Sequence, residues 1–186
     1  MYDAQKVISL ALNEVGYLEK DDAKQLHLAS AAPGDGNYTK YARDLDEIAF
    51  YNSRKIGYAW CDVFVDWCFV MAYGEKAALE LTFQPGWNLM NMGAGCRYSR
   101  EYYRKNGRLF EYPQPGDQVF FYTEGSTDIC HTGIVYHVAD GYVYTVEGNT
   151  SLEQSLDPNG GAVCKKRYSL SDARLAGFGR PGYEME

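Results

Sequence analysis

The hydrophobic pattern of this 186-residue chain changes its period once, close to Pro113 and Pro115. Before these prolines apolar residues recur at helical spacing, whereas after them they alternate in short runs that end at Gly, Asp or Asn. Helices followed by an antiparallel sheet predict an α+β domain. A chain of this length suits one core, so we expect a single domain over residues 1–186, with a helical part at about 1–110 and a sheet part at about 115–182.

The individual elements follow from the same two periods. Helices are expected at about 3–15, 38–48, 60–73, 75–81 and 99–106. About five strands are expected, at 117–123, 132–138, 142–147, 163–168 and 175–179. The segment 60–73 is apolar on nearly every side, so it should form the buried central helix, and the polar residues 20–37 should form a long loop.

Charge and hydropathy exclude two classes of partner. Lys and Arg number 18 against 25 Asp and Glu, and the formal net charge of −7 repels phosphate backbones. The longest basic run, Lys165-Lys166-Arg167, is too short to bind nucleic acid by itself. No apolar stretch reaches the roughly 18 residues of a membrane span, and the N-terminal residues lack the pattern of a signal peptide. We therefore expect a chain made in the cytoplasm, with no nucleic-acid partner and no membrane insertion.

The chain has five cysteines, an odd number, so at least one thiol is unpaired within it. Cys61 stands at the start of the expected central helix, where free N–H groups and the helix dipole stabilise a thiolate. The thiolate is the nucleophilic form, so Cys61 is the candidate nucleophile. The alternative interpretation is a small core residue, as buried cysteines usually are.

The other cysteines have structural interpretations. Cys68 follows Cys61 by two helical turns and should be buried beneath it. Cys130 should point into the core or the opposite layer, and the sequence leaves open whether Cys96 and Cys164 form a disulfide. No two cysteines have the close spacing of a zinc site.

A thiol nucleophile needs a base, and the chain has three histidines. His27 lies in the polar loop, where a solvated position is expected. His131 opens an expected strand, and His137 lies near its far end, about 20 Å away at strand rise, so one site cannot use both. His131 is the candidate base, because Gly133 beside it leaves room for substrate or backbone.

The hairpin after His131 decides which residue can orient it. A three-residue loop at 139–141 centres the strand pairing on Asp140. His131 then faces Asn149, and Glu147 lies diagonal to His131 on the same face. A two-residue turn would shift the register by one and send Glu147 to the other face. An oxygen that accepts a hydrogen bond from the imidazole fixes its tautomer, so Glu147 and Asn149 are candidate orienters.

Four short motifs occur in a characteristic order: Trp60-Cys61 with Val63-Phe64-Val65, Pro115-Gly116-Asp117, His131-Thr132-Gly133-Ile134-Val135 and Glu147-Gly148-Asn149-Thr150. In this order they resemble the CHAP domain, a family of cysteine, histidine-dependent amidohydrolases/peptidases in the papain-like, NlpC-type superfamily. The resemblance covers nearly the whole chain and is greatest to catalytic domains of endolysins from phages and prophages of Gram-positive bacteria. It implies a papain-like fold with N-terminal helices packed on the sheet.

The resemblance also implies roles for the candidate residues. Cys61 is the nucleophile, His131 the general base and then acid, Glu147 the orienter, and Asn149 a second polar position of the family. The implied function is a peptidoglycan hydrolase, with the N-acetylmuramoyl-L-alanine amidase reaction favoured and an endopeptidase of the same mechanism as the alternative. An intracellular thiol amidase and a non-catalytic wall-binding module are further alternatives, and the intact Cys61, His131 and Glu147 disfavour the last.

The remaining site residues are less closely defined. The backbone N–H of Cys61 should hold part of the oxyanion. Papain supplies a glutamine as the second donor, but residues 52–60 contain none, so Tyr58 is the candidate substitute. The aromatic residues that could line a substrate groove are Trp60, Trp87 and Tyr122.

Metal and targeting expectations complete the picture. Some phage members of the family bind calcium in the loop before the cysteine, but residues 52–55 are basic here, so no metal and no cofactor is expected. Gram-positive walls are anionic and repel a charge of −7. We expect a monomer that needs a separate wall-binding domain or targeting component, and that reaches the wall through a phage-type membrane lesion.

Overall fold

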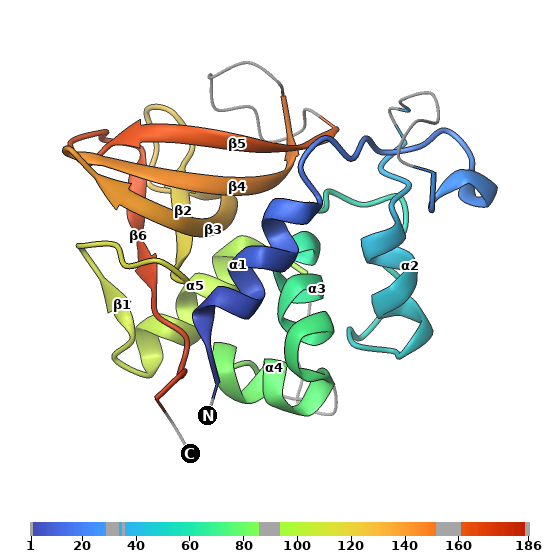
Figure 1. The fold of residues 1–186 in the computed structure, drawn as a ribbon, viewed down its shortest axis with the longest axis horizontal. Coiled ribbons are helices and arrows are strands. Elements are labelled where there is room, and N and C mark those ends of the chain that lie inside the picture. Colours follow the sequence, from blue (N-terminus) through green and yellow to red (C-terminus); the bar gives the residue numbers. More distant parts are fainter. Residues whose placement is uncertain (1, 29–33, 35, 86–93, 152–160, 185–186) are drawn as a thin grey trace.

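The computed structural model describes residues 2–28, 34, 36–85, 94–151 and 161–184. Within this part of the chain five α-helices precede a six-stranded antiparallel sheet, which confirms the α+β expectation (Figure 1). The helices are α1 (Ala4–Asn13), α2 (Lys40–Glu47), α3 (Cys61–Tyr73), α4 (Glu75–Thr82) and α5 (Cys96–Lys105), with a 3₁₀ turn at Ala23–Gln25. The strands are β1 (Leu109–Phe110), β2 (Gln118–Tyr122), β3 (Ile129–Ala139), β4 (Tyr142–Thr150), β5 (Ala162–Ser169) and β6 (Leu175–Gly179).

The strand order across the sheet is β1-β6-β2-β3-β4-β5. All five expected strands are present, and β1 is an addition, a two-residue strand that pairs with the end of β6. Such a short edge strand shows no alternation in the sequence, which is why the pattern did not predict it. β3 lies between β2 and β4, so His131 stands on a strand whose backbone is paired on both sides.

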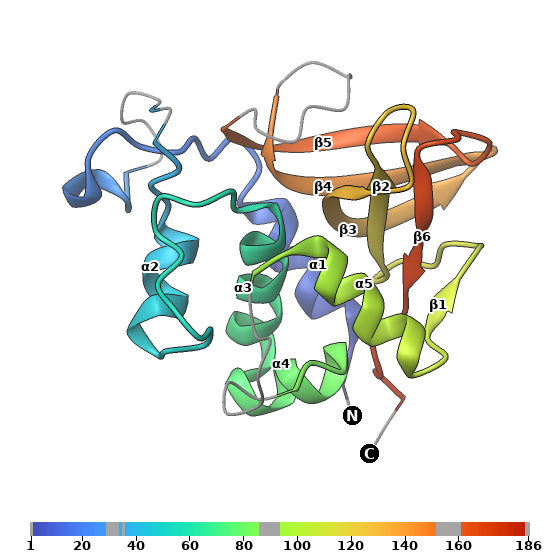
Figure 2. The same cartoon turned by 180° about the vertical axis from the view of Figure 1, so that it is seen from behind.

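Helix α3 is the buried centre of the helical part. Val63, Phe64 and Phe69 have no exposed surface, and α1, α2 and α4 pack around the helix (Figures 1 and 2). On another side α3 packs against β3 and β4. A Cβ atom at Gly148 of β4 would lie 2.7 Å from the Cβ of Phe64, so only glycine permits this close approach. The start of α3 is thereby held against the strands that carry the candidate site.

The β3–β4 hairpin turns through two residues, Asp140 and Gly141, with φ of 51° and 78°, instead of the expected three. Taken alone, this turn would send Glu147 to the wrong face. A β-bulge at Tyr136 takes up one residue of β3, so that toward the site the pairing is again centred on Asp140. The predicted loop length was therefore wrong, while the register that it was meant to supply at His131 is right.

Helix α5 begins at Cys96 rather than near residue 99. Its N-cap is Gly95, which has no capping side chain, so the sequence carries no start signal at this point. The start of α5 lies beside the first turn of α3 (Figure 2), where the Gly95 N–H donates to the Asp62 carboxylate at 2.9 Å. The earlier start brings Cys96 to the candidate site.

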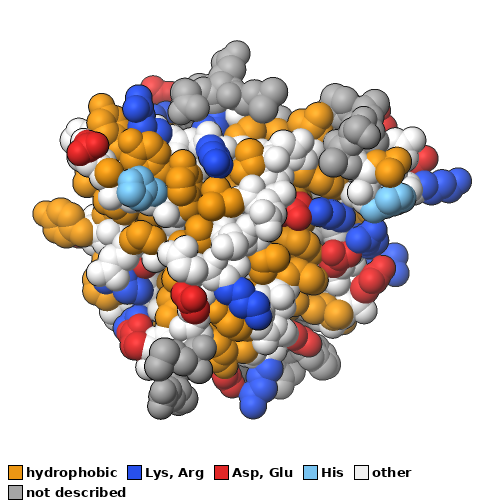
Figure 3. Space-filling view, in the orientation of Figure 1, with side chains coloured by type: hydrophobic (Ala, Val, Ile, Leu, Met, Phe, Trp, Pro, Cys, Tyr) orange, Lys and Arg blue, Asp and Glu red, His pale blue; other side chains and the backbone are white. Residues whose placement is uncertain are grey.

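Basic and acidic side chains are interspersed on the face drawn in Figure 3. Several cations have a carboxylate partner: a nitrogen–oxygen distance of 2.6 Å joins Lys40 to Glu14, and one of 3.0 Å joins Arg180 to Asp117. Such pairing neutralises these cations locally. None of the helices in the described ranges combines the length and the apolar character that a bilayer span requires.

Candidate active site

Cys61 is the first residue of α3, and its side chain is only 6% exposed. No side chain caps the start of the helix, so the first-turn N–H groups act on the thiol, and the Asp62 N–H donates to it. Trp60, just before it, is fully buried, and its Nε1–H donates to Glu19 Oε2 at 2.9 Å. A buried indole cannot line an open groove, which corrects the expectation for Trp60. Its role here is to anchor the chain that leads into Cys61.

His131 and Glu147 meet on one face of the sheet, at a distance of 3.0 Å between Nε2 and Oε2. Both side chains are completely buried. A Cβ atom at Gly133 would lie 2.5 Å from the Cγ of Glu147, so the glycine provides the space in which the glutamate lies. The structure therefore places Glu147 where the register argument expects it.

Two further residues hold Glu147. The Thr145 hydroxyl donates to Oε1 at 2.5 Å, and the Tyr168 hydroxyl donates to Oε2 at 3.2 Å. Sequence reasoning missed both. Thr145 lies two residues before Glu147 on the same strand and hence on the same face, which is a signal that period-2 alternation contains. Tyr168 comes from β5, and no local pattern connects it to Glu147.

The Cys61 thiol and the His131 imidazole shift each other's pKa, so the two groups lie close together. Glu147 occupies Nε2, and Nδ1 has no hydrogen-bond partner among the described residues, so Nδ1 is the nitrogen that is left to serve the thiol. The neighbouring Cys96 thiol, followed by the His131 side chain and its charge, outweighs burial and lowers the pKa of Cys61 well below its usual range. Burial alone would lower the pKa of His131, but its interactions with Cys61 and Glu147 have the larger effect and raise that pKa to about 10. Both directions favour a thiolate beside an imidazolium over a neutral thiol beside a neutral imidazole.

Cys96 is the main residue of the site that the sequence left unassigned. Its thiol lies near the Cys61 thiol, which raises its pKa, and its sulfur lies 3.9 Å from the Ile129 carbonyl oxygen. Cys130 lies near it, half-buried, with its thiol donating to the Phe121 carbonyl at 3.7 Å. All five cysteines are free thiols, so Cys96 and Cys164 form no disulfide.

Asp62 joins the elements that meet at the site. Its buried carboxylate accepts hydrogen bonds from the Gly95 N–H at 2.9 Å, the Ser99 hydroxyl at 2.8 Å and the Gln118 amide at 3.0 Å. Burial and the Cys61 charge raise its pKa to about 6, against the opposing effect of these donors. The contacts connect α3 to α5 and β2. An aspartate inside an otherwise apolar helix is the sequence signal for such a buried, fully bonded carboxylate.

The other residues predicted for the site, and the two remaining histidines, differ in how far they are buried. Asn149 is completely buried on β4 with a φ of 54°. Tyr58 is 64% exposed, and its ring lies 5.8 Å from the Lys55 ammonium. His27 is exposed, as expected, and His137 is exposed as well. Trp87 lies outside the described residues.

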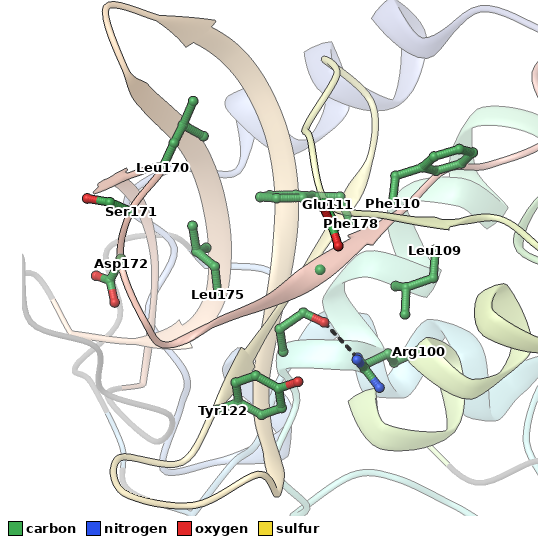
Figure 4. Close-up of a pocket in the computed structure, with 12 residues that line it drawn as sticks. Arg100, Leu109, Phe110, Glu111, Tyr122, Leu170, Ser171, Asp172, Leu175 and Phe178 are labelled. Atoms are coloured by element: carbon green, nitrogen blue, oxygen red, sulfur yellow. Dashed lines mark hydrogen bonds between the residues drawn. The ribbon is translucent and has the colours of Figure 1, made fainter.

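Tyr122 lines a hollow of about 490 Å³ between α5, β1 and the strand β6 (Figure 4). The Arg100 guanidinium lies in the same hollow and donates from Nε to the Ala176 carbonyl at 2.8 Å. Neither Cys61 nor His131 is among the lining residues. Tyr122 and the candidate nucleophile therefore do not share this hollow.

The loop that precedes Cys61 is held by one carboxylate. Asp46 accepts the backbone N–H groups of Lys55 at 2.7 Å and Ile56 at 3.2 Å. The Lys55 ammonium in turn donates to the Ser53 hydroxyl at 2.8 Å. In the part of the chain that the structure describes, no three His, Cys, Asp or Glu side chains are grouped as metal ligands. The loop is therefore organised by the Asp46 carboxylate and by the Lys55 ammonium.

Papain-like cysteine hydrolases have a cysteine at a helix start beside a strand histidine, and the second nitrogen of that histidine meets a carboxylate. Cys61, His131 and Glu147 have this arrangement. The family model of the CHAP domain matches residues 53–149, more than half of the chain. The chain belongs to the CHAP domain family, and it is a hydrolase of the amidase or peptidase class.

Comparison with solved structures supports the fold alone. The crystal structure of Ly7917 superposes with a TM-score of 0.53 and 15% sequence identity, over 97% of this chain and 62% of that one. The chain thus spans less than two thirds of the length of that protein. No curated protein matches the sequence.

Proposed function

We propose that the chain is a peptidoglycan hydrolase that cleaves an amide bond with Cys61 as the nucleophile. The observation that carries the proposal is that Cys61, at the start of a buried helix, lies beside His131, whose Nε2 is hydrogen-bonded to Glu147. Membership of the CHAP family supports the amide bond. The resemblance of the sequence motifs to endolysin catalytic domains is the ground on which we propose the wall as the substrate.

The reaction follows from the protonation states of the site. The Cys61 thiolate attacks the amide carbonyl carbon, and the Cys61 N–H at the helix start donates to the oxyanion. His131, already an imidazolium, gives its Nδ1 proton to the leaving nitrogen as the C–N bond breaks, which leaves a thioacyl-enzyme. Neutral His131 then takes a proton from water, which attacks the thioester and releases the acid. Glu147 keeps its bond to Nε2 throughout and stabilises the imidazolium whenever it forms.

The bond that is cut depends on how substrate is positioned. We favour the bond between N-acetylmuramic acid and L-alanine on resemblance to the family. Cleavage within the peptide stem or bridge uses the same chemistry and is a separate outcome of the test below.

The test is digestion of purified peptidoglycan, with the new termini identified by mass spectrometry. Wild type should release a free muramoyl carboxyl group and an L-alanine N-terminus if it is an amidase, or termini inside the peptide if it is an endopeptidase. Cys61→Ala should lose at least about 10³-fold in rate. Cys68→Ala is the matched control, because Cys68 lies buried in the same helix without a bond to His131. Undiminished cleavage by Cys61→Ala would overturn the mechanism, and binding without any new termini would indicate a wall-binding module.

The net charge of −7 underlies a proposal about delivery. An anionic wall repels such a chain, so binding to the wall depends on a wall-binding domain or another targeting component. The chain acts on the wall after it has been released from the cytoplasm. Lysis of whole cells by the isolated chain should therefore be weak at low salt and should rise when basic surface residues are added. Strong lysis that such substitutions leave unchanged would contradict this.

A further inference from the structure

A second thiol lies beside the candidate nucleophile. Cys96 is the first residue of α5 and Cys61 the first residue of α3, and a 2.9 Å hydrogen bond from the Gly95 N–H to the Asp62 carboxylate joins the two helix starts. The two thiols shift each other's pKa, as neighbouring groups do. Both are nearly buried, at 7% and 6% exposure. Amide cleavage needs one thiol as nucleophile, so Cys96 takes no covalent part in it, although it lowers the pKa of Cys61.

The contact is fixed by the elements on either side of it. Asp62, next to Cys61, accepts the N–H of Gly95, next to Cys96, and also the hydroxyl of Ser99 one turn into α5. These two bonds clamp the starts of α3 and α5 together. The two sulfur atoms are therefore neighbours in the folded chain, and their contact does not depend on a mobile surface loop.

A thiolate stabilised in this way is also the form that peroxides oxidise. We propose that Cys96 is the resolving thiol of Cys61, so that oxidation by a hydroperoxide is captured as a Cys61–Cys96 disulfide that reversibly switches the hydrolase off. The inference rests on the proposed function only in taking Cys61 as its reactive thiolate.

Two balanced steps give the disulfide. The Cys61 thiolate attacks one peroxide oxygen, so that an S–O bond forms, the O–O bond breaks, and hydroxide leaves. Sulfur is oxidised by two electrons and the peroxide is reduced, which gives a sulfenic acid. The Cys96 sulfur then attacks the Cys61 sulfur, the S–S bond forms, the S–O bond breaks, and the Cys96 proton leaves with the hydroxyl group as water.

The charges around Cys96 order these steps. In the reduced protein the neighbouring Cys61 side chain, burial and the negative charges of Cys61 and Asp62 raise the pKa of Cys96, so it remains a thiol. Oxidation of Cys61 to a neutral sulfenic acid removes the largest of these effects. Cys96 therefore becomes easier to ionise only after Cys61 has been oxidised, and it responds to the oxidised state.

The remaining thiols provide controls. Cys130 lies near Cys96 but donates its thiol hydrogen to the Phe121 carbonyl at 3.7 Å. Cys68 is buried farther along α3, and Cys164 stands on β5 opposite Glu147. Cys130→Ser is thus the matched variant, since it removes a thiol from the same neighbourhood without removing the partner of Cys61.

The experiment treats the full chain with hydrogen peroxide and maps its peptides under non-reducing conditions. Wild type and Cys130→Ser should lose two free thiols, gain a Cys61–Cys96 crosslink, and recover Cys61 alkylation by iodoacetamide after dithiothreitol. Cys96→Ser should show sulfenic and then sulfinic acid at Cys61, with recovery reduced to about a tenth of wild type or less. Cys96→Ala repeats the measurement with a smaller side chain, and thermal denaturation confirms that each variant is folded.

Three results would overturn the proposal: over-oxidation of wild-type Cys61 without a crosslink, a crosslink to Cys130 in place of Cys96, or equal recovery in Cys96→Ser and wild type. None of these readouts uses peptidoglycan. A failed digestion therefore leaves the disulfide result standing, and a missing disulfide leaves the hydrolase assignment standing.

Discussion

Replacing Gly133 by alanine adds one methyl group at the point where Glu147 meets His131. The new Cβ would lie 2.5 Å from Glu147 Cγ and 2.8 Å from the Val146 carbonyl oxygen, and the latter is backbone that cannot rotate away. Overpacking of this kind costs about 1–3 kcal/mol, and the smaller chain entropy of alanine returns about 0.4–1 kcal/mol. We therefore expect the free energy of unfolding to fall, by up to about 2.6 kcal/mol.

The same displacement weakens the hydrogen bond between Glu147 and His131 Nε2. A hydrogen bond to a charged group is worth about 1.5–3 kcal/mol, so its loss should lower kcat/KM by about ten- to 150-fold. The assay combines peptidoglycan cleavage, iodoacetamide alkylation of Cys61 and urea unfolding.

Gly179→Ala is the matched control for this variant. Its Cβ would meet the Tyr103 ring at 2.3 Å, away from Glu147, so stability should fall while activity per folded molecule is kept. If Gly133→Ala loses stability as Gly179→Ala does, yet keeps its activity and its alkylation rate, then the position of Glu147 does not control His131 and the reasoning is refuted.

Two further predictions concern pH and the loop before the nucleophile. Because the His131 pKa is raised to about 10, the imidazolium is present below that pH and is lost above it, so kcat/KM should fall on the alkaline side near pH 10. Glu147→Gln removes a charge that raises this pKa, so the alkaline limb of the pH profile should move to lower pH. An unmoved limb would contradict the pairing of Glu147 with His131. Asp46→Ala leaves the N–H groups of Lys55 and Ile56 without their acceptor, so the free energy of unfolding should fall by about 1–3 kcal/mol in urea titrations, whereas Ala at the exposed Asp21 should change it by less than about 0.5 kcal/mol.

Local periodicity was sufficient for most of the fold. The buried character of residues 60–73 predicted α3, and the alternation after Pro115 predicted five of the six strands, because those patterns are set by which face of an element is buried. β1 was not predicted because two residues are too few to show a period. The start of α5 was not predicted because Gly95 offers no capping side chain, and for the same reason the proximity of Cys96 to Cys61 was not predicted.

The three main residues of the candidate site could be predicted from their positions at the ends of expected helices and strands. Cys61, His131 and Glu147 could be chosen from a helix start, a strand start and a register argument, and the structure brings the three together. The donors to Glu147 and Asp62 come from strands and helices distant in sequence, which only tertiary packing selects. Trp60 was misjudged because an aromatic residue beside a nucleophile has the same local pattern whether it faces substrate or core.

The bulge at Tyr136 separates the hairpin into two parts with independent registers. On the side of His131, pairing is set by the close fit of Gly133 against Glu147, and beyond the bulge it is set by the Asp140-Gly141 turn. A change in the length of the turn is therefore absorbed before it reaches the glutamate. The pairing that places Glu147 therefore belongs to the part of the hairpin nearest the sheet centre, and the tip belongs to the turn alone.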